Sequence, residues 1–252
     1  MKKLIVTLVL ICGIGLAHAQ ELKVGLGGGI YSTWLVNTNV SDQGDDLDFA
    51  ATFGGQLGLE LMYYFKDNLG LSTGLLFTGH NQKYSGADDN GDPLYDAKVK
   101  LRYLDIPVLL RFGGGSKGAY FEFGPQFGIL MSAKDGYEGK VNGAEVVISD
   151  INTKDSFKGS NIAGILGFGV DIDASENVII TTGLRLGYAF TDATKEFGNE
   201  AALNAAPTVS FATYSAHYKQ TDSGKSPFGY AKTSRAFGGL HVAVLFKIPS
   251  KK

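Results

Sequence analysis

The sequence has a single cysteine, few prolines and no block of basic residues. Of its 252 residues, one is cysteine and 6 are proline. Because Cys12 lies in an N-terminal segment that we expect to be removed, the mature chain has no disulfide, thiolate metal site or cysteine nucleophile. Charged residues make up 19% of the chain and the formal net charge is −2, which argues against a nucleic-acid partner. After Ala19 no apolar run reaches the roughly 18 residues that a transmembrane helix needs.

Glycine and aromatic residues are abundant instead. The chain has 35 glycines, and 12% of its residues are aromatic. Disordered chains are poor in aromatics and rich in charge, so most of this chain is expected to fold. The glycines follow no repeat of three, which excludes a collagen helix. This composition indicates a β-rich envelope protein.

The N-terminus has the pattern of an export signal. Lys2 and Lys3 precede the apolar run Leu4–Leu16, which is followed by Ala17-His18-Ala19. A charged start, a short apolar core and small residues at a cleavage site identify a signal peptide. We therefore expect residues 1–19 to be removed and residues 20–252 to form one mature domain.

The mature chain alternates apolar and polar residues with period two, which predicts β-strands. Between Gln56 and Phe65, for example, every second residue is Leu, Tyr or Phe. Similar alternation predicts eight strands, at about 22–35, 56–65, 69–78, 99–112, 119–131, 161–172, 178–190 and 235–248. Each is long enough for the ~9–11 residues that a tilted strand needs to cross a bilayer.

Short and long connections between these strands alternate along the chain. Three are short, at 66–68, 113–118 and 173–177, and four are long and polar, near 36–52, 85–98, 132–160 and 191–234. This sorting is typical of an outer-membrane barrel with both termini on the periplasmic side and long loops outside. The predicted fold class is therefore all-β, an eight-stranded antiparallel up-and-down transmembrane β-barrel.

The faces of the strands predict what fills the barrel. One face is rich in Leu, Val, Ile and Phe, whereas the other carries small residues and isolated charges, so we place the apolar face against lipid. An eight-stranded barrel is only wide enough for its own side chains. Because unpaired buried charges are costly, we expect a structural polar network in the lumen. Its members are Glu60, Asp105, Arg111, Glu122, Asp171, Arg185 and His241. Pro107 and Pro125, in the middle of adjacent strands, predict a bulge or kink in the wall.

The central strands resemble a known family. Residues Tyr103–Arg111 (YLDIPVLLR) and Phe121–Gly128 (FEFGPQFG), with the glycine-rich Val24–Gly29, resemble motifs of the PorT-like outer-membrane β-barrels of Bacteroidetes. The resemblance implies an eight-stranded barrel in the outer membrane of a Gram-negative bacterium. The family's namesake is linked to the secretion of surface proteases, and its members share no catalytic residues.

We expect no enzyme chemistry, metal or other cofactor. The histidines lack the spacing of a metal site. An outer-leaflet lipid-modifying enzyme would need a histidine, a serine and an acid near the outer rim, and only His80, Ser85 and an acid of the Asp88 loop match that composition.

The last long loop is the best candidate for partner binding, because aromatic side chains dominate binding energy at interfaces. Its aromatic residues are Phe197, Phe211, Tyr214, Tyr218, Phe228 and Tyr230, which could instead fold the loop onto its neighbours. The favoured function is a structural or interaction role in the cell envelope, in contact with outer-membrane lipid and an envelope or secretion-system protein. A transporter of small or hydrophobic molecules and a lipid-modifying enzyme remain alternatives.

Overall fold

The computed structural model describes residues 21–41, 47–50, 52–87, 93–114, 118–141, 144–218 and 228–248. The predicted signal peptide, residues 1–19, lies outside these ranges. The strands are β1 (Glu21–Val36), β2 (Asp48–Ala50), β3 (Phe53–Lys66), β4 (Leu69–Ala87), β5 (Pro93–Gly113), β6 (Gly118–Val141), β7 (Ala144–Asn152), β8 (Ser160–Ser175), β9 (Val178–Ala189) and β10 (Ser234–Ile248). Short helical segments are α2 (Thr38–Ser41), η3 (Lys154–Ser156), α3 (Glu200–Asn204) and α4 (Phe211–Ser215).

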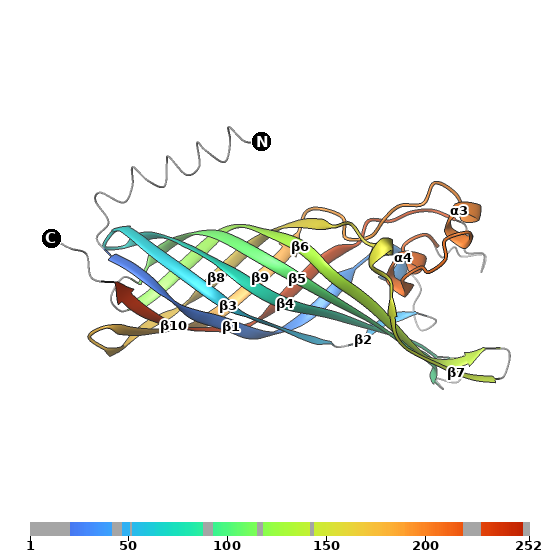
Figure 1. The fold of residues 1–252 in the computed structure, drawn as a ribbon, viewed down its shortest axis with the longest axis horizontal. Coiled ribbons are helices and arrows are strands. Elements are labelled where there is room, and N and C mark those ends of the chain that lie inside the picture. Colours follow the sequence, from blue (N-terminus) through green and yellow to red (C-terminus); the bar gives the residue numbers. More distant parts are fainter. Residues whose placement is uncertain are drawn as a thin grey trace.

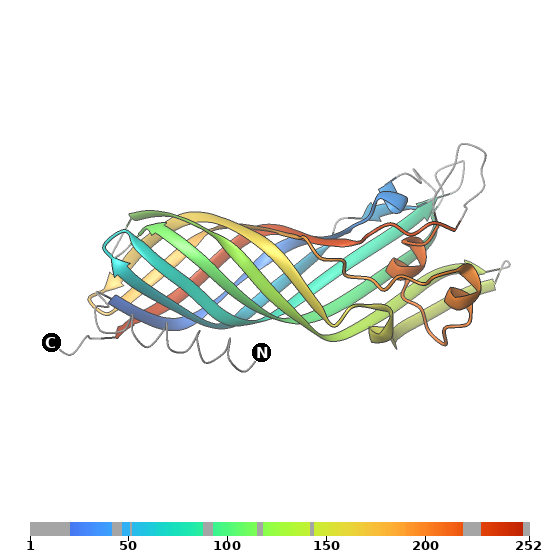
Figure 2. The ribbon, with the colours of Figure 1, turned by 90° about the horizontal axis from the view of Figure 1, so that it is seen from above.

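Eight strands close into an antiparallel barrel, which confirms the predicted fold class (Figures 1 and 2). The ring runs β1-β3-β4-β5-β6-β8-β9-β10, and β10 returns to β1 with Leu22 opposite Ile248 and Val36 opposite Ser234. Closure leaves no sheet edge within the ring, which is what a strand-built wall needs in lipid. The first residue of β1 and the last of β10 lie at the end that carries the short turns.

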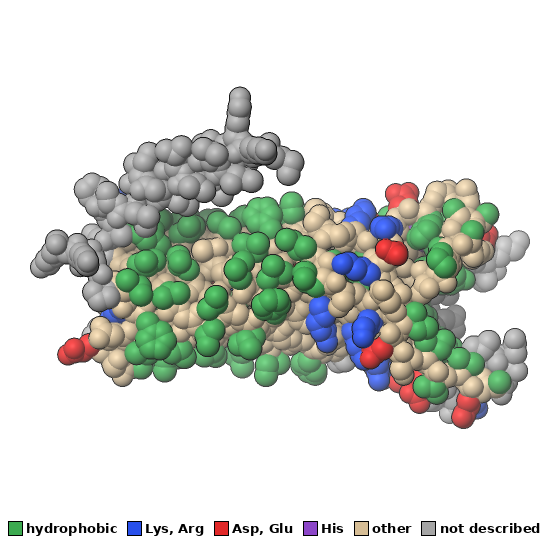
Figure 3. All heavy atoms as spheres, viewed as in Figure 1, with side chains coloured by type: hydrophobic (Ala, Val, Ile, Leu, Met, Phe, Trp, Pro, Cys, Tyr) green, Lys and Arg blue, Asp and Glu red, His purple; other side chains and the backbone are tan. Residues whose placement is uncertain are grey.

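The outer surface of the barrel is a broad apolar band (Figure 3). Ile30 is 71% exposed, Phe77 67% and Leu57 66%, and their neighbours on the outer face are also Leu, Val, Ile and Phe. Such a band is unstable in water and stable against hydrocarbon. Among the described residues, no helix is both long and apolar enough to span a membrane.

The polar and apolar faces of the wall are reversed beyond Arg102 on β5. From Leu104 to Phe112 the outward side chains are apolar, whereas Lys98, Lys100 and Arg102 are outward and exposed. Over the same upper stretch the inward Val99 and Leu101 are fully buried apolar residues. A wall that is polar outside and apolar inside suits water, so the apolar band ends at Arg102.

The strands continue beyond the band into two segments that the sequence assigned to loops. The expected loop at 85–98 is largely β4 and β5, and the expected loop at 132–160 contains the end of β6 and all of β7. Period-two alternation between lipid and lumen stops at the membrane boundary, so it could not report strand beyond that point. β7 pairs with β6 above the ring, as Figure 1 shows at the far end from the short turns.

The two mid-strand prolines coincide with gaps in the ladder. The register of β4 and β5 passes from Thr73 opposite Val108 to Leu76 opposite Asp105, and that of β5 and β6 passes from Pro107 opposite Gln126 to Leu110 opposite Phe123. Thr73 donates its hydroxyl to the Pro107 carbonyl over 2.7 Å, which satisfies an acceptor beside the first gap. The register shift itself lies elsewhere, between Arg102 and Tyr103, because β6 carries an extra residue there.

The barrel interior is layered along its axis. Near the short turns lies an apolar cluster of Met62, Tyr64, Ala243 and Leu245. A second cluster around Tyr31, Leu109 and Phe237 lies further along the strands. The largest cluster fills the opposite mouth, where Leu35, Val99 and Leu101 of the wall pack with Phe157 and Ala212 of the connecting segments.

Candidate functional site

The half of the lumen nearer the short turns, which we call the lower lumen, holds an ion-pair network built from the predicted charges. Arg111 lies 2.5 Å from Asp171 and 3.2 Å from Glu122. Arg185 lies 2.7 Å from Glu122 and 3.6 Å from Glu60. Glu60 in turn lies 3.0 Å from His241, so one chain of contacts links Asp171 to His241. All of these side chains are at most 3% exposed.

Inward-facing glycines make room for this network. A β-carbon on Gly27 would lie 2.4 Å from the carboxyl carbon of Glu60, and one on Gly167 would lie 2.8 Å from Glu122 Cγ. Contacts this close are not tolerated in a packed interior. Glycines on the inner face therefore allow the buried charges to fit, because each large side chain occupies the space beside a residue without a side chain.

A second ion pair lies higher in the lumen and includes a residue that the sequence reasoning missed. Predicted Asp105 accepts from Arg235 over 3.2 Å, and the Arg235 guanidinium stacks on Tyr103 at 3.7 Å. Asp105 therefore does not touch the lower network's arginines, although all of these groups face the interior. Counting back in twos from His241 along the strand would have placed Arg235 on the same face.

His241 is held in a way that fits packing better than catalysis. Its Nε2 faces Glu60, and its Nδ1 lies 3.1 Å from the Tyr31 hydroxyl. His241 is 1% exposed and Tyr31 is 2% exposed. A base and hydroxyl enclosed in this way cannot meet a substrate, so the arrangement stabilises the lumen and offers no active site.

The connecting segments beyond the apolar band form a cap, which we define as α2, η3, α3, α4 and residues 191–198 and 228–233. Its central anchor is Asp135 of β6, whose carboxylate accepts from Thr153 Oγ1 at 2.6 Å, Ser210 Oγ at 2.8 Å and Phe211 N at 2.7 Å. The last two bonds fix the start of α4 against the wall. An acid in the middle of a predicted loop gave no sequence signal for this role.

His217 anchors the other half of the cap. Phe197 N donates to its Nε2 over 2.8 Å, so Nδ1 carries the hydrogen and donates to the Thr213 carbonyl over 2.7 Å. The ring also packs against Tyr230 and Phe228, at centroid distances of 4.7 Å and 5.3 Å. His217 is 0% exposed, so both ring nitrogens are used in hydrogen bonds within the cap.

Most of the predicted partner-binding aromatics therefore pack within the cap or against the barrel wall. Phe197, Phe228 and Tyr230 surround His217, and Phe211 packs on Tyr84 and Tyr95. Tyr218 lies against Tyr214 at 4.6 Å. Tyr214 differs from the others because its side chain is 46% exposed.

Tyr214 borders an apolar groove between α4 and the β6–β7 hairpin. The groove has a volume of about 230 Å³, and its apolar lining includes Tyr137, Ile148, Ile151, Val209 and Phe211. Ile148 and Ile151 are 37% and 41% exposed. We call this the cap groove.

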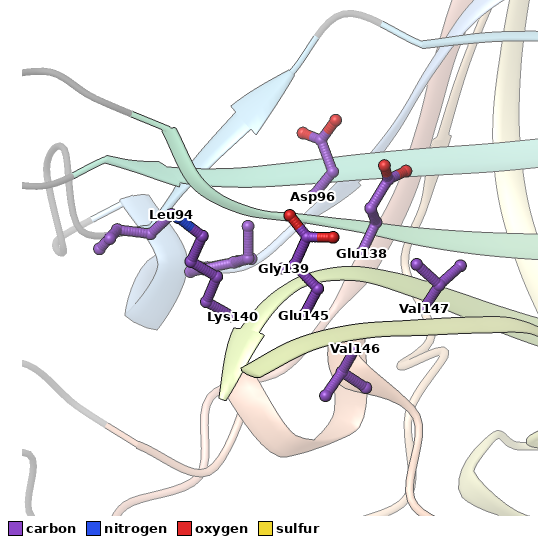
Figure 4. Close-up of a pocket in the computed structure, with 9 residues that line it drawn as sticks. Leu94, Asp96, Glu138, Gly139, Lys140, Glu145, Val146 and Val147 are labelled. Atoms are coloured by element: carbon purple, nitrogen blue, oxygen red, sulfur yellow. The ribbon is translucent and has the colours of Figure 1, made fainter. Parts of the chain in front are cut away.

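A more polar hollow of about 280 Å³ lies at the tip of the same hairpin (Figure 4). Asp96 of β5, Glu138 of β6 and Glu145 of β7 line it together with Lys140. Within the described ranges, no cluster of His, Cys, Asp and Glu side chains has the geometry to hold a metal ion.

The residues considered for a lipid-modifying enzyme do not converge. His80 is fully buried inside the wall, with Nε2 3.0 Å from the Trp34 carbonyl oxygen. Ser85 lies an odd number of positions further along β4, so it faces the other side of the wall. Asp88 lies outside the described residues.

Comparison with known proteins identifies the architecture. A family model described as "Outer membrane protein beta-barrel domain" matches residues 18–195. No curated protein matches the sequence.

Solved barrels are similar in outline only. The Neisserial surface protein A shares 11% identity over 90% of this chain and 97% of its own, with a TM-score of 0.41. The attachment invasion locus protein Ail of Yersinia pestis shares 9% identity over 91% of this chain and all of its own, with a TM-score of 0.36. The outer membrane protease OmpT of Escherichia coli shares 8% identity over 91% of this chain and 97% of its own, with a TM-score of 0.37. Likeness at this level says nothing of what this chain binds.

Proposed function

Because the chain belongs to the outer membrane protein β-barrel domain family, we propose that it is a closed barrel that binds another component of the cell envelope through its cap. The cap groove carries this proposal. It combines an exposed tyrosine with exposed isoleucines at the far end from the short turns, where a partner can reach them.

The orientation follows from the asymmetry of the barrel. The start of β1, the end of β10 and the three short turns lie at one end of the barrel, and the cap lies at the opposite end. Barrels of this kind keep short turns in the periplasm and long connections outside. We therefore place both termini in the periplasm and the cap at the cell surface, after removal of residues 1–19.

The filled lumen favours binding over transport or catalysis. Buried ion pairs occupy the lower lumen, and apolar side chains fill the mouth beneath the cap. A solute path would have to displace paired charges, and His241 of the lower network is enclosed with Glu60 and Tyr31. The transporter and enzyme alternatives therefore rank lower.

The occupant that fits the cap groove is an apolar segment of another envelope protein. β7 pairs with β6, and within the described residues no other strand covers its second edge. An exposed strand edge offers backbone hydrogen bonds to an added strand, and the adjoining groove accepts its side chains. The YLDIPVLLR motif supports placement among the PorT-like barrels, so a secretion-system component is the favoured partner.

Photo-crosslinking in cells tests this proposal. A benzoylphenylalanine placed at Tyr214 or at Ile151 is expected to give a discrete heavier species on irradiation. The same label at Lys195, which is exposed on the cap outside the groove lining, is the matched control and is expected to give none. Absence of a groove adduct, or an equal adduct at Lys195, would reject the cap groove as the binding surface.

A further inference from the structure

Five cations gather on the outside of the wall where the apolar band ends. They are Lys83 of β4, Lys98, Lys100 and Arg102 of β5, and Lys134 of β6. The register places them on adjacent strands, with Lys83 opposite Lys98 and Lys100 opposite Lys134. Figure 3 shows Lys and Arg side chains gathered at this end of the band. We call this group the rim cluster.

The first residues below the rim cluster face hydrocarbon. Leu104, two positions after Arg102, lies opposite Phe77 on one side and Ile129 on the other. Phe77 is 67% exposed and Ile129 is 47% exposed. One row of the ladder therefore separates a lipid-facing surface from a row of cations, which puts the cations at the level of lipid headgroups.

We infer that the rim cluster binds the phosphate groups of an outer-leaflet glycolipid of the lipid A type, whose acyl chains lie on the apolar band below. Guanidinium and ammonium groups are the side chains that proteins use for phosphate. The inference rests on the proposed orientation, because it needs the cap end to face outward.

The charge of the rim cluster is only partly neutralised by the protein. Lys83 pairs with Asp96 at 2.9 Å and Lys100 with Asp150 at 3.0 Å. Lys98, Arg102 and Lys134 have no carboxylate within ion-pair distance among the described residues. Glu138, opposite Asp96, lies on the side away from the band. Excess positive charge therefore remains next to the lipid, where an anionic headgroup complements it.

The shape of the surface also suits a headgroup. A hollow of about 230 Å³ lies over β4, between the start of β3 and β5, and is lined by Phe53, Asn81, Lys83, Lys98 and Lys100. Below it the outward positions on β3 and β4 are Gly55 and Gly79, which carry no side chains of their own. The Arg102 guanidinium lies across Gly79 and donates one bond to Asn81 Oδ1 at 3.0 Å. That bond fixes the guanidinium at the edge of the hollow.

Lipid binding by the purified mature chain in detergent tests the inference. The protein is titrated with diphosphoryl lipid A and with the same lipid lacking both phosphates, and bound lipid is counted by native mass spectrometry. We expect the diphosphorylated form to bind at least about tenfold tighter. The triple variant Lys98→Gln, Arg102→Gln, Lys134→Gln is expected to lose most of that preference, because it removes the three rim cations that have no ion pair among the described residues.

A matched triple variant controls for net charge. Lys66→Gln, Lys140→Gln and Lys195→Gln remove the same charge from exposed positions outside the rim cluster and are expected to keep the preference. Heat-modifiable mobility on gels verifies that each variant folds. If the first triple variant does not fold, Lys98→Glu with Lys134→Glu, which leaves Arg102 and its bond to Asn81 intact, replaces it.

Three results would overturn the inference. They are equal affinity for both lipids, an unchanged preference in the rim variant, and complete displacement of lipid A by millimolar inorganic phosphate, which would indicate a site for the free anion. The measurement uses no partner protein and no membrane orientation. A negative lipid-binding result would therefore reject the rim cluster without affecting the proposed role of the cap groove. A negative crosslinking result would reject the cap groove without affecting lipid binding by the rim cluster.

Discussion

At the scale of single residues, Glu122 is the centre of the lumen network. It receives Arg111 at 3.2 Å and Arg185 at 2.7 Å and is 1% exposed. Gly167 opposite it on β8 leaves the space that its side chain occupies. A carboxylate between two guanidiniums offsets their repulsion as well as their loss of hydration. Its removal takes one carboxylate from each of two buried cations and leaves Arg111 with Asp171 and Arg185 with the more distant Glu60.

We predict that Glu122→Gln lowers the free energy of unfolding by about 3 kcal/mol, the usual cost of breaking a buried ion pair from one side. Urea unfolding in lipid vesicles, followed by heat-modifiable mobility, measures the change. Glu138→Gln is the matched control, because Glu138 lies on the same strand but is exposed, and its effect is expected to stay within about 0.5 kcal/mol. A Glu122 variant as stable as the control would show that the network contributes little to stability.

At the scale of elements, the sequence predicts strands well where lipid imposes a pattern. All eight members of the ring were predicted, because each must alternate between hydrocarbon and a crowded lumen. Above the band that constraint ends. β4, β5 and β6 then continue as paired strands with Lys98 outward and Val99 inward, a pattern with the opposite polarity.

The cap could not be predicted from local sequence for a different reason. Asp135 binds α4 across 76 positions of chain, and Asn39 of α2 donates to the carbonyls of Ala216 and Gly229. Contacts between such distant segments leave no periodic signal. The sequence singles out the aromatic residues of the last loop, but their spacing could not distinguish a binding surface from a packed interior.

We predict that Tyr230 makes the cap sensitive to alkaline pH. Its hydroxyl donates to Asp192 and lies 3.1 Å from the Thr194 carbonyl oxygen, and Asp192 also accepts from Thr233 N at 3.0 Å. Burial, and then the hydrogen bond with the Asp192 carboxylate, raise the pKa of Tyr230 above its usual value of about 10. A raised pKa means that the stabilisation is complete below about pH 10 and is lost as the pH rises through the higher folded value.

Subtilisin cleavage of the cap, corrected for cleavage of an unstructured peptide at each pH, measures this effect. At pH 8 the variant Tyr230→Phe is expected to be cut about fivefold faster, for a loss of roughly 1 kcal/mol. Above pH 10 the wild type is expected to approach the variant. Parallel curves for the two proteins over the whole range would show that Tyr230 does not titrate in the cap.

At the scale of the whole molecule, the barrel is a rigid wall around a solid interior. Apolar clusters lie near the short turns, at mid-height and at the mouth, and ion pairs are buried in the same lumen. Eight strands leave room for side chains and nothing wider. The two proposed binding surfaces, the rim cluster and the cap groove, therefore both lie outside the lumen.

The closed interior predicts that the folded protein does not conduct ions. Any ion path would cross Arg111 and Arg185, each held by carboxylates at 3.2 Å or less, and then the apolar mouth beneath the cap. Opening such a path requires separating buried pairs, which costs several kcal/mol for each charge left alone. Planar bilayers containing the purified barrel are expected to stay at baseline current, with insertion verified independently by protection from protease. Discrete, ion-selective current steps from the wild type would contradict a sealed lumen and favour a transporter, and Glu122→Gln would then be expected to change their size.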